Sequence, residues 1–393
     1  MKQIARVIST YTADVSGVCS ALYELGGMVV MHDPSGCNST YNTHDEPRWY
    51  HMDSLIFISG LAEIDAIMGN DEKLIDDVAE AAKELSPAFI ALVRTPIPML
   101  NGTDFDAIAS IITRRTGIPA FYFPTNGTYS YVMGAGMALE KITDFYTEPP
   151  GSGKADGRAA ERIGVNLLGV TPLDFSINST VESLKTFLDQ EGFERISCIA
   201  MGSSLSDIAR AGEARVNLVV SSAGLPAARM LEKKFGIPYV AGMPTGIFAR
   251  IVAEDLRQAA GTGQSVFSCT KRPSGEEAEI TIIGEAVISG SLAAAIFRYC
   301  GRPVRVICPL EADRELFVAG DQSICEEEEL EEFLKNVSQK APPKTAHLIA
   351  DPLYRPICPL GVSFHALPHE AFSGRIYRKQ IPDLVRILLP ENA

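Results

Sequence analysis

Short apolar segments and longer amphipathic segments alternate along most of this chain. The short segments have the length of a β-strand, and Gly, Pro or Ser follows most of them. The longer segments repeat apolar residues at the spacing of a helix that packs on a sheet. Alternating strands and helices of this kind are typical of parallel sheets that carry helices on both faces. The pattern therefore predicts an α/β fold.

The first part of the chain shows the pattern most clearly. Residues 70–85 predict a helix, because Asn70 is suited to cap it and acidic residues follow at the positive end of the helix dipole. Leu74, Val78 and Leu85 belong to its apolar stripe. The strands that we expect around this helix are residues 27–32, 54–59, 88–93 and 118–123.

Two polar breaks divide the chain into three parts. Residues 147–160 and 271–277 are rich in Pro, Gly and charged residues, and the strand–helix pattern restarts after each break. We expect domains at residues 1–150, 161–272 and 278–393. A single core rarely extends beyond about 250–300 residues, so several domains suit a chain of 393 residues. The predicted architecture is three Rossmann-like, doubly wound parallel-sheet domains in series.

Composition and charge narrow the class of protein. Hydrophobic residues make up 46% of the chain and charged residues 21%, which is typical of a folded globular protein. The formal net charge of −14 disfavours binding to nucleic acid and to anionic membrane surfaces. The sequence has neither a signal-peptide pattern nor an uninterrupted apolar stretch of about 18 residues. We expect a soluble cytoplasmic protein.

Two of the eight cysteines lie in a context that suits metal binding. Cys19 precedes a predicted short helical turn, and Cys37 lies in a Pro-Ser-Gly loop after a predicted strand. Gly36 would let the backbone approach a bulky inorganic group, and His32 could ligate or support it. On the residues alone, a purely structural role for both cysteines stays open, because no Cys-x-x-Cys motif is present.

A family resemblance favours the metal-binding interpretation. Residues 32–37, His-Asp-Pro-Ser-Gly-Cys, resemble the His-Gly-Pro-x-Gly-Cys loop of nitrogenase component 1 subunits, and Cys19 stands where that family keeps its preceding cluster cysteine. Residues 59–74 resemble the family's acidic, glycine-containing segment that follows. Asn166-Leu-Leu-Gly opens the second domain as in the family. The resemblance implies an oxidoreductase subunit with an iron–sulfur cluster.

Three departures from the family limit what the resemblance implies. Thr95 stands where the family usually has a third cluster cysteine, so Cys19 and Cys37 supply only two thiolates per chain. The resemblance then implies a [4Fe-4S] cluster shared between two chains, in a homodimer or a heterodimer with a related subunit. Ser221 stands where nitrogenase holds its large cofactor by a cysteine, which disfavours dinitrogen reduction. Asp33 replaces a glycine of the cluster loop.

The last part of the chain supplies the candidate catalytic residues. His365, His369 and Arg375 lie near predicted strand ends, which is the edge where α/β units bind ligands. They could deliver protons or anchor an organic substrate. Capped polar groups in a proline-containing turn would explain the same residues.

The resemblance also implies a partner and a reaction class. The chain has no Gly-x-x-x-x-Gly-Lys-Ser/Thr loop, so an ATP-dependent reductase similar to the nitrogenase iron protein would supply the electrons. The implied substrate is a small molecule, which could be tetrapyrrole-like. Two alternatives stay open: a non-catalytic scaffold for metal-cofactor assembly, and a metal-free small-molecule binding protein on the same fold.

Overall fold

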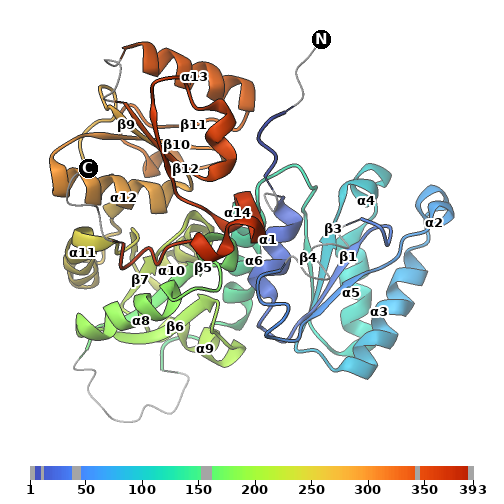
Figure 1. Cartoon of the computed structure of the whole chain (residues 1–393). Helices are drawn as coiled ribbons and strands as arrows, with labels where there is room; N and C mark the ends of the chain where they lie inside the picture. Colours follow the sequence, from blue (N-terminus) through green and yellow to red (C-terminus); the bar gives the residue numbers. More distant parts are fainter. Residues whose placement is uncertain (1–4, 10–12, 38–45, 152–161, 341–345, 388–393) are drawn as a thin grey trace.

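Three parallel β-sheets, each with helices packed on it, build the molecule (Figure 1). The computed structural model describes residues 5–9, 13–37, 46–151, 162–340 and 346–387. We call the parts built on the three sheets the first, second and third unit, in chain order. The predicted α/β class with parallel sheets is confirmed, while the predicted domain boundaries stay predictions.

The first unit has a four-stranded sheet in the order β2-β1-β3-β4. Its strands are β1 (Met28–His32), β2 (Leu55–Ile58), β3 (Ile90–Arg94) and β4 (Ala120–Phe123). Its helices are α1 (Asp14–Leu22), α2 (Glu63–Met68), α3 (Asp71–Leu85), α4 (Pro96–Asn101), α5 (Phe105–Thr116) and α6 (Tyr131–Tyr146). Alternate residues of β1 face opposite sides: Met28 and Val30 pack with α3 and α5, whereas Val29 and Met31 pack with α1 and α6.

The second unit also has four strands, in the order β6-β5-β7-β8. Its strands are β5 (Gly164–Val170), β6 (Glu194–Ala200), β7 (Val216–Val219) and β8 (Tyr239–Ala241). Its helices are α7 (Pro172–Phe175), α8 (Thr180–Gln190), α9 (Leu205–Ala209), α10 (Leu225–Phe235) and α11 (Ala249–Thr262). Every residue of β5 is buried, as expected for a central strand that is covered on both faces.

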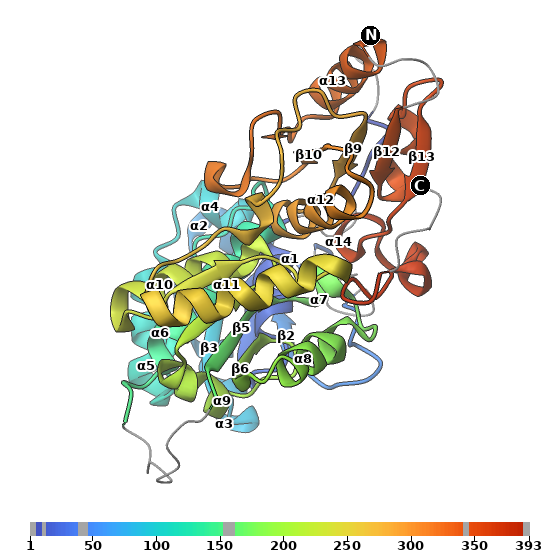
Figure 2. The ribbon, with the colours of Figure 1, turned by 90° about the vertical axis from the view of Figure 1, so that its left-hand side faces the viewer.

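The third unit has five strands, in the order β11-β10-β9-β12-β13. Its strands are β9 (Ile280–Ile283), β10 (Val304–Cys308), β11 (Gln322–Ser323), β12 (His347–Ala350) and β13 (Ser363–Ala366). Its helices are α12 (Ala286–Cys300), α13 (Glu327–Lys340) and α14 (Glu370–Ser373). Figure 2 shows α12 between the third sheet and α11, and Ile288 and Ala295 of α12 belong to the hydrophobic core of the second unit.

Helices α1 and α6 cross in direct backbone contact, which fixes the centre of the molecule. A Cβ atom on Gly17 would lie 2.1 Å from the carbonyl oxygen of Tyr131, and one on Gly134 would lie 1.9 Å from that of Asp14. Neither position has room for a side chain. The start of α6 lies beside α7 and α14, where the three units meet, because Tyr131 bonds to Asp174 of α7 and its ring lies 6.2 Å from that of His369, which precedes α14. We call this region the junction.

Both ends of the described chain cross to another unit. The backbone amides of Arg6 and Val7 donate to the carboxylate of Glu327 on α13. At the other end, the side-chain amide of Asn178 donates to the carbonyl of Ile381, and the Thr245 hydroxyl donates to that of Leu384. The last described residues therefore lie against the second unit, although the third unit precedes them.

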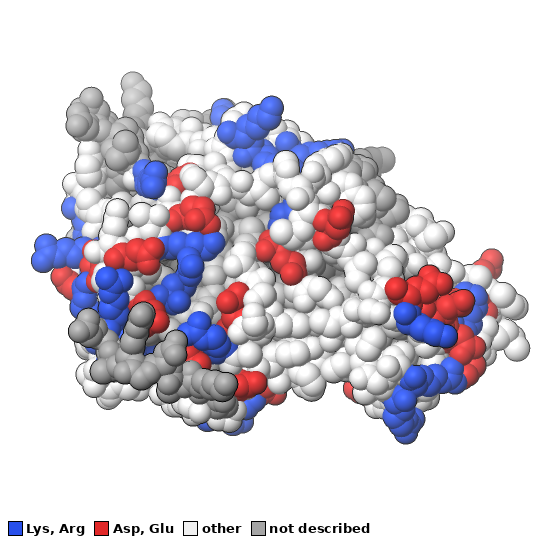
Figure 3. All heavy atoms as spheres, turned by 90° about the horizontal axis from the view of Figure 1, so that it is seen from below, with Lys and Arg blue, Asp and Glu red and all other residues white. Residues whose placement is uncertain are grey.

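The described surface carries charges of both signs. On the face in Figure 3, Lys and Arg lie among Asp and Glu at the end of the molecule that holds α3 and α5. There, Arg115 of α5 forms ion pairs with Glu72 and Asp76 of α3. None of the helices in the described residues is long and apolar enough to cross a membrane.

Candidate functional site

Cys37 lies in an exposed turn that directly follows β1. Its amide donates to the carbonyl of Pro34 at 3.0 Å, which closes the turn. A Cβ atom on Gly36 would meet nothing within 4 Å, so the backbone of this turn borders open space. The predicted loop thus presents the Cys37 thiol at the carboxyl edge of the first sheet.

His32, the last residue of β1, is buried behind this turn. Its Nδ1 forms a hydrogen bond with Ser59 Oγ at 2.8 Å, and its ring packs edge-on against Phe105. Burial, together with the charge of Lys73, lowers the pKa of His32 to about 4. A neutral imidazole fixed in this way supports the loop rather than projecting into solvent.

Cys19 lies in a very different environment. It stands inside α1, which begins at Asp14, rather than before a helical turn as its sequence context suggested. Its side chain has no exposed surface and belongs to the hydrophobic core of the first unit. Burial, reinforced by the nearby carboxylate of Glu46, raises the pKa of the thiol and favours its protonated form.

A buried ion-pair network lies next to Cys19. Arg48 pairs with Glu46 at 2.6 Å and with Glu24 at 2.8 Å, and its guanidinium also donates to the carbonyl of Ser20. Glu24 also accepts a hydrogen bond from the amide of Gly202 in the second unit. These contacts close the end of α1 and separate Cys19 from solvent.

The structure places the two predicted cluster ligands in different environments, with Cys19 buried and Cys37 exposed. A cluster ligand shared between two chains needs its sulfur at the surface, and only Cys37 of the predicted pair meets that condition. The Thr95 hydroxyl donates to the carbonyl of His32 at 2.7 Å and so ties β3 to β1. Within the described ranges, no group of three His, Cys, Asp or Glu side chains could hold a metal ion.

An apolar surface lies beside the Cys37 turn. On α2, Ile64, Ile67 and Met68 are 64%, 71% and 75% exposed, and Leu100 of α4 is 79% exposed. We call these four residues the α2–α4 surface. The amide of Leu61, just before α2, donates to the carbonyl of Asp33 and links this surface to the loop after β1. Clustered exposed apolar side chains are typical of a protein–protein contact.

The junction brings polar side chains from all three units together. Tyr131 of α6 donates its hydroxyl to the carboxylate of Asp174 at 2.6 Å, and Thr171 donates to the other oxygen of Asp174 at 2.7 Å. His369 of the third unit places Nε2 3.6 Å from Asp174. Neither imidazole nitrogen of His369 has a hydrogen-bond partner among the described residues, although both are buried.

Buried carboxylates surround this centre. Glu285 caps α12 and accepts hydrogen bonds from the amide and hydroxyl of Ser222 in the second unit. Burial and the nearby charge of Asp174 raise the pKa of Glu285. Glu370 pairs with Arg378 at 2.6 Å and accepts a hydrogen bond from Ser176 of the second unit. The junction is therefore polar and closely hydrogen-bonded around His369.

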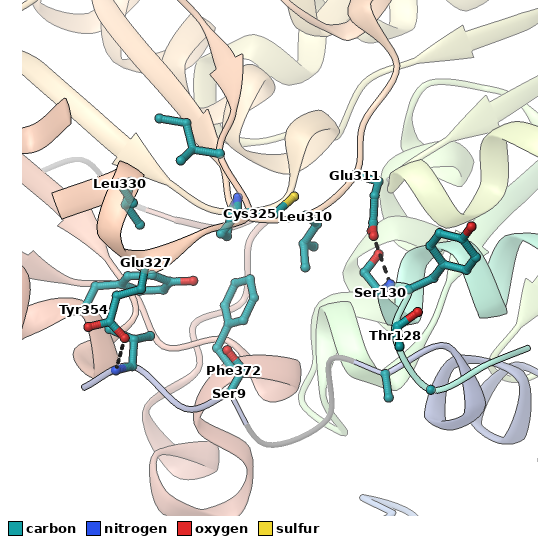
Figure 4. Close-up of a pocket in the computed structure, with 16 residues that line it drawn as sticks. Ser9, Thr128, Ser130, Leu310, Glu311, Cys325, Glu327, Leu330, Tyr354 and Phe372 are labelled. Carbon is teal, nitrogen blue, oxygen red and sulfur yellow. Dashed lines mark hydrogen bonds between the residues drawn. The ribbon is translucent and has the colours of Figure 1, made fainter. Parts of the chain in front are cut away.

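A cavity of about 260 Å³ opens between the first and third units next to this centre. Figure 4 shows Glu311 and Ser130 facing each other on one side of it, with Phe372 and Tyr354 toward the other side. The ring of Phe372 packs 4.7 Å from that of His369, so the cavity and the junction share a wall.

The other predicted site residues lie apart from His369. His365 is exposed on the edge strand β13, where its Nε2 lies 2.9 Å from Nδ1 of His347. Arg375 is exposed after α14. Ser221, at the family's cofactor-cysteine position, is buried and donates to the carbonyl of Gly169 at 2.7 Å. The three candidate catalytic residues are thus not brought together.

Asp174, Tyr131 and Glu311 were not singled out from the sequence. Asp174 follows β5 within the Thr-Pro-Leu-Asp turn, in which Thr171 caps α7. Glu311 follows β10 by three residues. Each of these two acidic residues follows a buried strand closely. That position could have marked them as candidates, because the carboxyl edges of parallel strands form ligand sites. Their convergence with Tyr131 depends on packing between units.

Comparison with known proteins identifies the family. The family model described as nitrogenase component 1 type oxidoreductase matches residues 16–279. The chain belongs to this family, so the resemblance seen in the sequence is confirmed.

Several relatives refine the comparison. The chain is 25% identical over 235 residues to the nitrogenase iron-molybdenum cofactor biosynthesis protein NifE of Bradyrhizobium diazoefficiens, covering 59% of this chain and 41% of that protein. It is 28% identical over 183 residues to a light-independent protochlorophyllide reductase subunit of Nostoc punctiforme, covering 46% and 36%. The chain therefore spans about half the length of its curated relatives, or less.

Solved structures agree on the fold. A structure of nitrogenase Cp1 at pH 5 matches with a TM-score of 0.60 and 17% sequence identity, covering 96% of this chain and 86% of that chain. The match includes the third unit, which extends beyond the residues of the family model. The whole described chain therefore has a nitrogenase component 1 fold.

Proposed function

We propose that this chain is a nitrogenase component 1-like subunit that holds a cofactor, or a precursor of one, at the junction during its assembly. This was one of the two alternatives to an electron-relaying enzyme that the sequence left open. The observation that carries it is His369, whose two buried ring nitrogens have no hydrogen-bond partner within the described residues. Several relatives, the Bradyrhizobium diazoefficiens protein among them, are named as cofactor biosynthesis proteins, which supports the same role.

The chemistry of His369 suits a holding role. An imidazole nitrogen can bind a metal or exchange a hydrogen bond with an organic ligand. Asp174 lies close enough to orient the ring, and Tyr131 and Thr171 fix that carboxylate from two sides. A buried polar group without a partner costs about 1–3 kcal/mol, and a bound ligand would recover part of that cost.

The test is whether a ligand purifies with the protein. We expect native mass spectrometry and metal analysis of anaerobically purified chain to detect a bound species, with occupancy at least about tenfold lower in His369→Gln. His365→Gln is the matched control, because it removes a histidine of the same unit outside the junction, and its occupancy should equal that of the wild type. Equal occupancy in His369→Gln, or a wild type without ligand, would reject the proposal.

A second function is favoured by the α2–α4 surface. An electron-accepting oxidoreductase subunit needs a docking site for its reductase next to the first electron acceptor. The exposed Ile67 and Met68 lie beside the loop that carries Cys37, which suits that requirement. This second proposal includes an ATP-dependent iron-protein-like reductase, a homodimer or heterodimer, and a small-molecule substrate such as a tetrapyrrole.

The metal content separates the two functions. The electron-relay function requires the shared [4Fe-4S] cluster, and α1 would have to rearrange before Cys19 could ligate it. Iron, sulfide and EPR analysis should then give about four irons per dimer, lost in Cys37→Ala and in Cys19→Ala. Metal-free protein after anaerobic reconstitution would exclude this function. Iron that survives in Cys19→Ala would exclude the predicted ligand pair.

A further inference from the structure

The cavity at the junction has an uneven distribution of charge. Among the described residues that line it, two are glutamates, Glu311 and Glu327, and none is Lys, Arg or His. Glu327 is already bound by the amides of Arg6 and Val7 and by the Arg6 side chain. Glu327 is thus paired with Arg6, whereas Glu311 faces a cavity whose described lining has no cationic side chain.

Glu311 is held at the start of a long helix. The amide of Ser130, which caps α6, donates to Glu311 Oε2 at 3.2 Å. The first turn of this 16-residue helix carries no acidic side chain of its own. The positive end of its dipole attracts a neighbouring negative charge. Glu311 is thus fixed in position by a contact between the first and third units.

Ser130 provides a second polar group. The residue is 8% exposed, and its hydroxyl has no hydrogen-bond partner in the described part of the chain. Because Ser130 lines the cavity, a ligand there would be within reach of this hydroxyl. An unpartnered buried hydroxyl at the edge of a cavity indicates a place for a ligand's polar group.

Backbone amides near the cavity, which could otherwise bind an anion, already donate to carboxylates of the protein. Asp14 accepts hydrogen bonds from the amides of Asn126 and Gly127 at 2.8 Å, and Glu311 takes the amide of Ser130. Burial raises the pKa of Asp14, and repulsion from Glu311 adds a smaller contribution in the same direction. An added anion would be repelled by Glu311 on the wall and by the nearby buried Asp14, whereas a cation would be attracted to both.

The remaining walls also suit a cation. Tyr129, Tyr354 and Phe372 contribute aromatic rings to the lining. Aromatic faces attract ammonium groups, and a carboxylate with a hydroxyl offers acceptors for their N–H donors. An ammonium group has three such donors and no acceptor, which matches Glu311 and Ser130 better than a neutral alcohol does.

We propose that this cavity binds a small molecule through a protonated amine, with Glu311 and the Ser130 hydroxyl accepting its N–H groups. The inference deepens the proposed function, because it rests on a ligand at the junction and names its chemical class. The volume of about 260 Å³ limits the ligand, or the part of it inside the cavity, to a compact group.

Three probes of one shape test the charge preference. Benzylamine, benzyl alcohol and benzoate share a ring and differ in the charge of the attached group. We expect ligand-observed NMR titration of the full chain to rank benzylamine first. Glu311→Gln should raise its Kd at least about tenfold, since hydrogen bonds to charged groups are the strong ones. Glu328→Gln, which removes an exposed charge from α13, should leave the Kd unchanged.

The outcomes separate this inference from the proposed function. Tighter binding of benzoate, or a benzylamine Kd that Glu311→Gln leaves unchanged, would overturn the amine inference alone, because the cavity would still hold a ligand. Ser130→Ala should weaken benzylamine less than Glu311→Gln does, and thermal unfolding of both variants checks that they fold. Absence of binding by all three probes would overturn the amine inference, and the occupancy of the His369 variant would still decide the proposed function.

Discussion

The strands of the first unit end against two different surroundings. On the side of α1 and α6, the chain is packed against the other two units, and polar groups such as Asp174 are bonded across unit boundaries. On the side of α2 and α4, Ile67 and Leu100 are exposed to solvent, and no residue of α2 is buried. Both regions follow the carboxyl edge of one sheet, where α/β folds place ligands.

The difference between the two regions suits two functions, which are ligand binding and partner binding. A closed polar junction can hold and orient a ligand, because its side chains are already fixed before binding. A bare apolar surface is suited to a partner that binds and leaves. The two predicted cysteines fall on opposite sides of this division, with Cys19 enclosed and Cys37 exposed.

The largest expected effect is on the closed side. Gly134→Leu should destabilise the fold by about 3 kcal/mol or more, because a Cβ at this position would lie 1.9 Å from a backbone oxygen of α1. Chemical denaturation measures this loss. Gly261→Ala on α11 is the control, since nothing lies within 4 Å of its Cβ position, and it should be neutral or slightly stabilising. Equal stability of both variants would show that α1 and α6 do not pack as described.

The second effect compares the cysteines directly. The test uses the Cys325→Ser variant, in which the exposed thiol of Cys325 can no longer compete for the reagent. In this variant, iodoacetamide should modify Cys37 at least about 100-fold faster than Cys19. The reason is that Cys19 reacts only after local opening, and an opening free energy of about 3 kcal/mol gives this ratio. Peptide mass spectrometry follows both rates. Similar rates would contradict the difference in exposure between the two cysteines and would show that Cys19 is accessible enough to bind a metal.

The third effect lies at the boundary between the two sides. The folded state keeps His32 neutral down to a pKa of about 4, whereas an unfolded histidine binds a proton near pH 6.5. Between these values the unfolded state binds more protons, so stability should fall as the pH falls, by up to about 1.4 kcal/mol per pH unit. Denaturation of wild type and His32→Gln from pH 7 to 4 measures the slope. The variant should be flatter, while the exposed His51→Gln should match the wild type.

The smallest effect is on the exposed side. Ile67→Glu should change the free energy of unfolding by less than about 0.5 kcal/mol, because the side chain is 71% exposed. The substitution should still abolish any reductase binding that uses the α2–α4 surface. A pull-down with the reductase measures binding, and denaturation measures stability. A large loss of stability would mean that the Ile67 side chain packs within the fold and is not part of an exposed binding surface.

Local patterns predicted the fold well. The segment 70–85 was expected as a helix, and α3 spans Asp71–Leu85 with Asn70 as its cap. The four strands expected in the first part each appear within a few residues of β1 to β4. These elements depend on neighbours in sequence, because caps and apolar periodicity are local properties.

The candidate site could be predicted only in part. The exposed turn at Cys37 follows from the Pro-Ser-Gly loop after a strand, and His369 does lie at the junction. The burial of Cys19 results from the contact of α1 with α6, and that contact depends on Gly17 and Gly134, far apart in sequence. The pairing of Tyr131 with Asp174 likewise joins two units. Local patterns carry no signal for such contacts.

The crossing of the chain ends also has a consequence for folding. The amide of Arg6 binds Glu327 across 321 positions of sequence, and Asn178 binds Ile381 across 203. Contacts of such separation close large loops, so they form late and slowly compared with the strand–helix contacts within each unit. We therefore expect three units that first fold separately and then dock. The cavity beside His369 would come into existence only in that last step, as the product of docking rather than of any single unit.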